Sequence, residues 1–423
     1  MDLLSDLEYR GLAYQSTNRE ALAAHLAEAS RSLYCGFDPT NDSLTVGNLL
    51  PLTLLARFQR AGHRPVAVMG GGTGLIGDPS GKSSERQMLS IEDVERNVES
   101  QRRSFERILD FSGANGAVIK NNFEWLGKLS YIEALRDVGK HFSVNMMIQK
   151  DSVRERLNTR EQGISYTEFS YMLLQAYDYL HLFRAEGVTL QVAGSDQWGN
   201  IVAGIDLIRR VERAETHGFT APLVTKADGT KFGKSESGAV FLNADRTSPY
   251  AFYQFWLNCE DVQVGKYLKF YTFLERDRIE ELLAAHAENP GARAAHRALA
   301  GHLTELVHDK SGLESALAAT EALFSGNVRG LPLDTLNELF ASAPSVSLPK
   351  DRLSGGADIV ELLVEGSVVK SKREAREFLQ QGAILLNGTK ATLEQKIDTE
   401  ALLHGSVVLV RRGKKSWHVL RFN

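Results

Sequence analysis

Cysteine and long apolar runs are both scarce in this sequence. Two cysteines, Cys35 and Cys259, stand among 423 residues, too few for a disulfide framework or a cysteine-rich metal cluster. No window approaches the roughly 18 uncharged apolar residues of a membrane-spanning helix. The first residues, MDLLSDLEYRGLAYQS, carry acidic side chains where a signal peptide has its apolar core. We therefore expect a protein that works in the cytoplasm.

Histidine pairs with metal-ligand spacing and a phosphate-binding P-loop are missing as well. None of the histidines has the spacing of metal ligands, so we expect no metal site in the protein itself. The stretch GLIGDPSGKSS contains a glycine-lysine-serine sequence, but only three residues separate Gly77 from Gly81. A P-loop needs four residues there, so this stretch is not a Walker motif.

Strands that alternate with helices dominate the first half of the chain. Apolar runs at 32–37, at 64–71, at 116–122 and from 188 onward predict strands, and the segments between them predict helices. Such alternation predicts an α/β fold with a Rossmann-like, doubly wound parallel sheet. Ligands of these sheets bind beyond the carboxyl ends of the strands, at the point where the strand order reverses.

The pattern changes after residue 248. A helical stretch comes first, then a segment rich in serine and proline, and last a small α+β module with a hairpin at Asn387-Gly388. We expect a Rossmann-like domain, a mobile lysine-rich segment, a helical domain, a linker and a small α+β terminal module. The expected boundaries are 1–224, 225–248, 249–324, 325–356 and 357–423.

Charge is unevenly distributed, although the net charge is only −4. The terminal module, 357–423, has eleven Lys and Arg residues against eight Asp and Glu residues, whereas the rest of the chain is acidic. A basic module on an acidic body is typical of local nucleic-acid binding. A chance bias on a solvated surface is the other interpretation, and charge alone leaves both open.

Polar groups that are typical of a binding site fall at the expected strand ends. The stretch CGFDPTNDSLTVGN, 35–48, places turn formers between a strand and a helix N-terminus, as many phosphate sites do. Tyr171, Gln175 and Asp178 share one face of an expected helix. The stretch GSDQWGN, 194–200, adds further polar groups at a strand end. Their convergence predicts a pocket, although a helix face in water would also be polar.

A loop with several lysines follows, in the stretch TKADGTKFGKSESG, 225–238. Lys226, Lys231 and Lys234 lie among glycines there. An exposed charged loop is one interpretation. A mobile clamp on a polyphosphate is the other, because such a clamp stabilises charge that develops on a pyrophosphate leaving group.

Taken together, these motifs closely resemble those of bacterial tyrosyl-tRNA synthetases, which are class I aminoacyl-tRNA synthetases. The match covers nearly the whole chain, through CGFDPT, RFQRAGHRPVAVMGGGTGLIGDPSGK, GKHFSVN, GISYTEFSYMLLQAYD, GSDQWGNI, DGTKFGKS and the S4-like RNA-binding module. The resemblance implies a homodimer, with a dimer-forming insertion in the first domain and a helical domain that binds the anticodon. It implies conversion of L-tyrosine and ATP, which carries Mg²⁺, to tyrosyl-adenylate and pyrophosphate, followed by transfer of tyrosine to the 3′ end of tRNA(Tyr).

The resemblance also implies a role for each matching residue. Tyr34 and Asp178 match the pair that hydrogen-bonds the phenol of the substrate. The rest of the tyrosine pocket is Asp78, Tyr171, Gln175 and Gln197. The ATP-binding positions are Gly36, Asp38, Gly47, Asn48, Gln191, Asp196 and Lys234. The catalytic positions, which include the Lys-Phe-Gly-Lys-Ser form of the mobile loop, are Thr40, Thr45, Asn48, Lys82, Arg86, Lys231, Lys234 and Ser235. The tRNA-binding positions are Arg209, Arg210, Lys370, Lys372, Arg373 and Arg376.

One departure from the family pattern lies in the class signature His-x-Gly-His, which here is Thr45-Val46-Gly47-Asn48. Loss of one transition-state donor typically costs about 3–4 kcal/mol. The alternative function is therefore a catalytically weakened paralogue with an RNA-binding or regulatory role. Some tryptophanyl-tRNA synthetases carry Thr-x-Gly-Asn at this position, which makes tryptophan another candidate substrate. Tyr34 with Asp178 argues against tryptophan, because indole has no para hydroxyl for them to bind.

Overall fold

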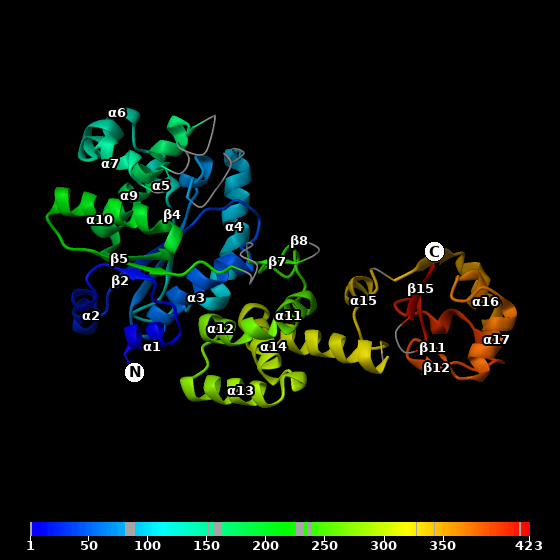
Figure 1. Ribbon diagram of the computed structural model, residues 1–423. Helices are drawn as coiled ribbons and strands as arrows, with labels where there is room; N and C mark the ends of the chain where they lie inside the picture. The colour runs from blue at the N-terminus through cyan, green and yellow to red at the C-terminus, as the bar shows by residue number, and fades with distance from the viewer. Residues whose placement is uncertain are drawn as a thin grey trace. The chain divides into compact units, whose positions relative to one another are not determined.

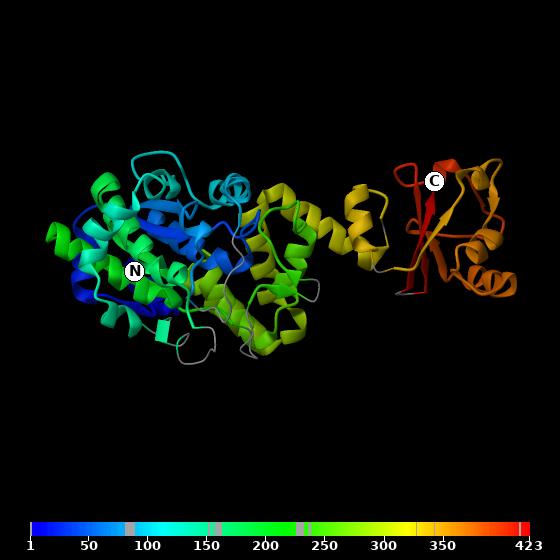
Figure 2. The same cartoon turned by 90° about the horizontal axis from the view of Figure 1, so that it is seen from above.

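The computed structural model contains two compact units, Met1–Asp309 and Lys310–Asn423, which Figures 1 and 2 trace in two views. The structure describes residues 2–80, 89–150, 153–154, 157, 163–225, 232–235, 238–326, 328–341, 343–413 and 416–423. Among these residues, no helix is long and apolar enough to cross a membrane. The domain boundaries expected from the sequence remain predictions.

A six-stranded sheet forms the centre of the first unit, in the order β1-β6-β5-β2-β3-β4. All neighbouring strands run parallel except β1, which pairs antiparallel with β6 at the edge. The strands are β1 (Gln15–Ser16), β2 (Ser32–Phe37), β3 (Arg64–Met69), β4 (Val118–Asn121), β5 (Val188–Gly194) and β6 (His217–Ala221). The predicted doubly wound parallel sheet is confirmed, and the order reverses between β2 and β5. The strands β1 and β6 are additions that the sequence did not predict.

Helices cover both faces of this sheet, which explains why β3 is apolar on both sides. In Figure 1, α9 (Tyr166–Glu186) and α10 (Trp198–Glu212) lie above the strands, and α3 (Val46–Arg60) lies below them. The Tyr34 ring of β2 packs at 5.2 Å from the Tyr179 ring of α9. On the other face, Phe37 packs at 4.9 Å from Phe105 of α4 (Ile91–Ile108).

Helix α9, which carries three predicted site residues, has clear start and stop signals. Ser165 caps its N-terminus, because the hydroxyl accepts the Glu168 N–H at 3.2 Å. Gly187 ends it in a left-handed conformation with φ of 63°. Residues 131–141, in a segment between predicted strands that was expected to be helical, form three short turns. These are α6 (Tyr131–Glu133), a π-helical turn (Ala134–Val138) and a 3₁₀ turn (Gly139–His141), followed by α7 (Val144–Ile148).

The helices that follow the sheet belong largely to the same unit. They are α11 (Pro249–Leu257), α12 (Asp261–Tyr271), α13 (Arg276–Glu288) and the start of α14 (Ala294–Ser325). Arg57 of α3 is buried, and its Nη2 donates to the carbonyl oxygens of Thr272 at 2.5 Å and Phe270 at 3.3 Å. These bonds fix the C-terminal end of α12 against α3. Before the sheet come α1 (Leu3–Tyr9) and α2 (Arg19–Glu28), with β1 between them.

The second unit contains a five-stranded sheet in the order β12-β11-β14-β15-β9. Its main helices are α15 (Leu333–Leu339), α16 (Ile359–Glu365) and α17 (Lys372–Gln380). Its sheet strands are β9 (Ser345–Leu348), β11 (Ile384–Leu386), β12 (Thr389–Lys390), β14 (Val407–Arg412) and β15 (Ser416–Phe422). The hairpin predicted at Asn387-Gly388 joins β11 to β12, and both turn residues have positive φ. Strand β9 pairs parallel with β15, although it lies in the range expected to be a linker.

Candidate active site

The predicted site residues gather where the strand order reverses, between the carboxyl ends of β2 and β5. Asp38 directly follows β2, and a 3₁₀ turn, Ser195–Gln197, directly follows β5. A glycine-rich turn follows β3 beside them. A Cβ atom at Gly70 would lie 2.2 Å from Asp38 Oδ1, so a side chain there would displace the carboxylate. The crevice is the place at which this fold binds ligands.

The innermost group of the site consists of Tyr34 and Asp178, both buried. The Asp178 carboxylate accepts the Trp125 indole N–H at Oδ1, at 2.7 Å, and the Asn122 amide N–H at Oδ2, at 2.9 Å. Burial raises the pKa of Asp178 to about 7, against the lowering effect of these two hydrogen bonds. Burial first, and then the charge of Asp178, hold the pKa of Tyr34 well above its ordinary value, so its hydroxyl is protonated.

The Tyr34 hydroxyl is buried and has no hydrogen-bond partner within the described parts of the chain. An unpaired buried hydroxyl costs roughly 1–3 kcal/mol, so a polar group that binds it gains an interaction. The hydroxyl and the Asp178 carboxylate offer a donor and an acceptor to one small polar group. A phenol hydroxyl, which both donates and accepts, matches that pair.

A chain of hydrogen bonds leads from Asp178 to Tyr171. The Asn122 amide also donates to Thr73 Oγ1 at 3.0 Å, and Thr73 donates to Asp38 Oδ1 at 2.9 Å. The Tyr171 hydroxyl donates to Asp38 Oδ2 at 3.1 Å. Burial, and next the charge of Asp38, hold the pKa of Tyr171 well above its ordinary value. The chain therefore fixes two carboxylates and one phenol in the same crevice.

A second network surrounds Asp78. Its Oδ2 accepts the Gln197 Nε2 at 2.7 Å, and its Oδ1 accepts the Ser80 N–H at 2.9 Å. Asn200 Nδ2 donates to Gln197 Oε1 at 3.1 Å and to Gln175 Oε1 at 3.0 Å. Thus Asp78, Gln175 and Gln197, which come from three different parts of the sequence, lie in one connected group. Carboxylate and amide oxygens in such a group suit an ammonium ion.

The variant signature Thr45–Asn48 forms the start of α3. Asn48 Oδ1 accepts both the backbone N–H and the hydroxyl of Thr45, each at 3.0 Å. The Asn48 oxygen therefore faces the helix cap, and its amide nitrogen faces away from it. Gly47, between them, is exposed. This helix N-terminus presents amide donors and no ionisable side chain.

The lysine-rich segment is described only in part. Lys82, Arg86 and Lys231 lie outside the described residues, and only the backbone of Lys234 and Ser235 is described. These two residues form β7 (Lys234–Ser235), which pairs antiparallel with β8 (Gly238–Ala239). A Cβ atom at Gly233 would lie 2.8 Å from Val46 Cγ2. The structure thus brings the backbone of this segment to the first turn of α3.

The remaining predicted ATP-binding and catalytic residues lie around the same crevice. Gly36 is exposed near the end of β2, and Thr40 is exposed in the turn after it. Asp196 is exposed beyond β5. Gln191 is different, because it is buried inside β5 and pairs in register with Tyr34. It lies beside Tyr34 of the buried pair.

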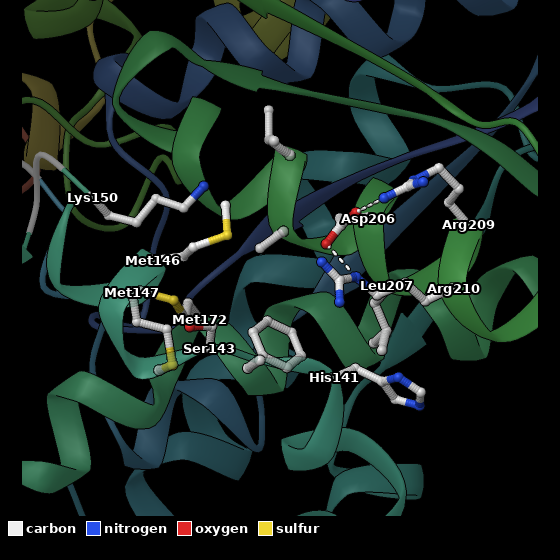
Figure 3. A pocket seen from close by; sticks show the side chains of 13 residues that line it. His141, Ser143, Met146, Met147, Lys150, Met172, Asp206, Leu207, Arg209 and Arg210 are labelled. Carbon is white, nitrogen blue, oxygen red and sulfur yellow. Dashed lines mark hydrogen bonds and ion pairs between the residues drawn. The ribbon is translucent and has the colours of Figure 1, made fainter.

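The predicted tRNA-binding arginines lie at the C-terminal end of α10. Arg209 and Arg210 each form an ion pair with Asp206, at 2.6 Å and 2.7 Å. They line a cavity of about 280 Å³ together with Lys150 and several methionines, and Figure 3 shows both guanidinium groups directed at Asp206.

In the second unit, the predicted tRNA-binding residues lie on or next to the first turns of α17, and they are Lys370, Lys372, Arg373 and Arg376.

Three side chains of the hydrogen-bonded chain around Asp178 were missed by the sequence analysis. Asn122 follows the carboxyl end of β4 and Thr73 follows that of β3, so the strand-end rule could have found both. Trp125 gives no such signal, because its role depends on the indole N–H that meets Asp178 from α5 (Phe123–Leu126). Within the described residues, no three His, Cys, Asp or Glu side chains come together as a metal site.

Comparisons with known proteins identify the family of the chain. The family described as tRNA synthetases class I (W and Y) matches residues 27–325, and a tyrosine–tRNA ligase SYY-like C-terminal domain matches residues 335–420. The chain is 50% identical to a tyrosine–tRNA ligase of Bacillus caldotenax over the whole of both proteins. It is also 50% identical to one of Chromobacterium violaceum, over 98% of this chain and 97% of that protein.

Solved structures show the same relationship. A C-terminally truncated mitochondrial tyrosyl-tRNA synthetase of Aspergillus nidulans is 30% identical, with a TM-score of 0.70 over 76% of this chain and 94% of that one. A tyrosyl-tRNA synthetase of Archaeoglobus fulgidus, 17% identical with a TM-score of 0.56 over 74% of this chain and all of that one, shares the fold. The chain therefore belongs to the tyrosine–tRNA ligases of the class I tRNA synthetases, as its motifs predicted.

Proposed function

We propose that this protein activates L-tyrosine with ATP and then transfers the tyrosyl group to the 3′ end of tRNA(Tyr). The observation that carries the choice of substrate is the buried pair of Tyr34 and Asp178. Together they offer a donor and an acceptor at a buried position. Tyrosine fits such a pair, whereas the indole of tryptophan would leave both groups unpaired.

Two sets of polar groups divide the recognition of tyrosine between them. Tyr34 and Asp178 bind the phenol, and Asp78, Tyr171 and Gln175 bind the α-ammonium group, with Gln197 holding Asp78 in place. The 2.7 Å bond from Gln197 to Asp78 and the bond from Tyr171 to Asp38 support this arrangement. Both ends of the amino acid are then fixed, and its carboxylate faces the nucleotide.

Activation itself needs no nucleophile from the protein. A carboxylate oxygen of tyrosine attacks the α-phosphorus of ATP, a new O–P bond forms, and the bond to the bridging oxygen breaks, so that pyrophosphate leaves. Catalysis then consists of orientation and stabilisation of the developing charge. We assign this stabilisation to Mg²⁺ carried with ATP and to Lys82, Arg86, Lys231, Lys234 and Ser235.

The start of α3 supplies the remaining nucleotide contacts. Asn48 turns its amide oxygen to the Thr45 cap, so its N–H groups are available to the nucleotide. Gly47 lets the nucleotide approach the helix closely. Thr40 assists the terminal phosphates, and Gly36, Asp38, Gln191 and Asp196 complete the nucleotide side. The Thr45 hydroxyl must release Asn48 before it can bind a phosphate.

The tRNA is bound by basic side chains of both units. Arg209 and Arg210 lie on α10 near the cavity of Figure 3 and are proposed to contact the acceptor stem. The basic group near the start of α17 is proposed to contact the RNA backbone, which positions RNA without specifying its sequence. In the transfer step, a hydroxyl of the terminal ribose attacks the tyrosyl carbonyl, and AMP leaves.

A homodimer is the proposed assembly. Large apolar side chains are exposed on α6, α7 and the start of α9, among them Tyr131 (64%), Ile132 (68%), Met146 (58%) and Tyr166 (62%). The Tyr131 and Tyr166 hydroxyls lie 3.4 Å apart, so α6 and the start of α9 adjoin. Exposed apolar side chains that gather on adjoining elements are typical of an interface. We place the dimer in the cytoplasm, where tRNA is charged.

One assay tests the function. Exchange of pyrophosphate with ATP is expected in the presence of tyrosine and Mg²⁺, and is not expected when tryptophan replaces tyrosine. Exchange that occurs with tryptophan but not with tyrosine would contradict the proposal. Binding of tRNA(Tyr) without exchange would instead favour the weakened, RNA-binding paralogue.

A truncation tests the division of labour. Strand β9 ends at Leu348 and pairs with β15, so a cut after Leu348 would leave one strand of this sheet behind, whereas a cut after Ser325, the last residue of α14, removes the whole sheet. This truncated protein is expected to retain exchange and to lose charging of tRNA(Tyr). Loss of both activities in a folded truncation would contradict the separation.

A further inference from the structure

Phe232 follows Lys231 in the Lys-Phe-Gly-Lys-Ser segment, and aromatic side chains surround its ring. The ring centroid lies 5.0 Å from that of Tyr267 and 5.6 Å from those of Phe255 and Trp256. Tyr271 completes the group at 5.9 Å. We call Phe255, Trp256, Tyr267 and Tyr271 the aromatic cage.

The aromatic cage belongs to the core of the first unit. Trp256 and Tyr271 are fully buried, and Tyr267 is 3% exposed. The Trp256 ring lies 5.0 Å from Tyr271 and 5.9 Å from Tyr267, within the range of favourable aromatic pairs. Two helices, α11 and α12, supply these side chains (Figure 1). A ring that packs among them is held by fixed neighbours.

The cage also has a fixed position relative to the nucleotide end of α3. Arg57 of α3 donates to the Thr272 and Phe270 carbonyls at the end of α12, and Arg10 Nη1 donates to the same Thr272 carbonyl at 3.1 Å. Helix α3 begins directly after Thr45. Helix α12, which supplies Tyr267 and Tyr271 of the aromatic cage, is therefore joined by hydrogen bonds to α3, which begins with the variant signature.

Immediately after Phe232, the backbone lies on the first turn of α3. Gly233 has φ of 91°, and a Cβ atom there would lie 2.8 Å from Val46 Cγ2. Its carbonyl accepts the Val240 N–H at 2.9 Å, and the Val240 carbonyl accepts the Val46 N–H at 3.0 Å. Phe232 is thus separated by one residue from Lys234, at the point where the segment meets the helix N-terminus.

We infer that Phe232 is a positioning residue for tyrosine activation. Its ring, seated in the aromatic cage, fixes the backbone of Gly233 and Lys234 over the first turn of α3, and so fixes where the segment meets the phosphates. The inference rests on the proposed function. A displacement of about 1 Å at a reacting centre lowers a rate by as much as 10²-fold.

The first test compares three variants of the full chain. Phe232→Ala is expected to lower the single-turnover rate of tyrosyl-adenylate formation by about 10- to 100-fold. Its dissociation constant for tyrosine is expected to stay within about twofold of the original, because the tyrosine networks do not include Phe232. Phe232→Leu, which still fills the cage, is expected to recover most of the rate. Phe111→Ala, a size-matched change at a partly exposed phenylalanine of the same unit, is expected to leave the rate unchanged.

The second test approaches the same contact from the cage. Tyr267→Ala is expected to slow adenylate formation, and the double variant with Phe232→Ala is expected to be no slower than the slower single variant, because both remove one contact. If the fold-loss in rate of the double variant equals the product of the fold-losses of the two single variants, the inference is overturned. An unchanged rate in Phe232→Ala, or a parallel loss of tyrosine binding, would overturn it as well.

A third measurement separates this inference from the proposed function. Hydrogen exchange at the Val240 amide, which donates to Gly233, is expected to accelerate at least about tenfold in Phe232→Ala, with no change at the Val46 amide. Unchanged protection at Val240 would overturn the inference even in an active enzyme. If the original chain does not exchange pyrophosphate with ATP, the proposed function fails. Hydrogen exchange at the Val240 amide then still decides whether Phe232 fixes the backbone of this segment.

Discussion

Replacing Trp125 with phenylalanine removes one hydrogen bond from the carboxylate proposed to bind the tyrosine phenol. The indole N–H donates to Asp178 Oδ1 at 2.7 Å, and burial already raises the pKa of Asp178 to about 7. A hydrogen bond to a charged group contributes about 1.5–3 kcal/mol, which corresponds to about one to two pKa units. The pKa of Asp178 in Trp125→Phe is therefore expected at about 8–9.

The sign of this shift determines the effect on activity. At pH 7.5 the original carboxyl is mostly ionised and can accept a hydrogen bond from the phenol, whereas the variant carboxyl is mostly protonated. The ionised fraction falls by about 3- to 25-fold between these two states, and kcat/KM for tyrosine is expected to fall in proportion. Activity should return as the pH approaches 9, because ionisation is then restored.

Pyrophosphate exchange measured from pH 6 to pH 9.5 checks this shift. The original protein is expected to lose kcat/KM for tyrosine below a midpoint near pH 7, and Trp125→Phe below a midpoint one to two units higher. Trp417→Phe, which changes a tryptophan in the second unit, is the matched control and should keep the original midpoint. An unchanged midpoint in a folded Trp125→Phe would refute the assignment of Asp178 as the titrating group.

Four further outcomes follow from the site and the surface. Tyr34→Phe should raise kcat/KM for phenylalanine relative to tyrosine by at least about tenfold in exchange assays, because one partner of the phenol is lost. Asn48→Ala should slow adenylate formation by about 10²-fold with tyrosine affinity retained, since an amide donor to the nucleotide is lost. Ile132→Asp should give a monomer in light scattering, because a charge enters the exposed apolar surface. Folding raises the pKa of Asp178 to about 7, so between about pH 4 and 7 this carboxyl is protonated in the folded protein and ionised in the unfolded chain. Thermal stability should therefore fall as pH rises across that window, and Asp178→Asn should remove this contribution.

Much of the architecture was predictable because its signals are local. The strands at 32–37 and 64–69 are short apolar runs with turn formers after them, and α9 has a serine cap at Ser165 and a glycine stop at Gly187. The strand-end rule then placed Asp38 and Gln197 in one crevice. These inferences need only a few consecutive residues each.

The features that were missed depend on distant partners. Strand β6, His217–Ala221, is short, and its place in the sheet depends on pairing with β5 and β1. Strand β9 lies in a serine-rich stretch that becomes a strand only through β15. The link from Trp125 to Asp178 joins side chains from two helices, and no local pattern encodes it.

The hydrogen-bonded chain from Trp125 through Asp178, Asn122 and Thr73 to Asp38 also limits how this site can evolve. Each member satisfies a buried neighbour, so replacing one leaves another unpaired at roughly 1–3 kcal/mol. A change of specificity to another amino acid must therefore pass through these destabilised single variants, or several positions must change together. The proposed specificity for a phenol is therefore protected by the folding stability of the protein, and selection on abundance alone would remove most single substitutions away from it.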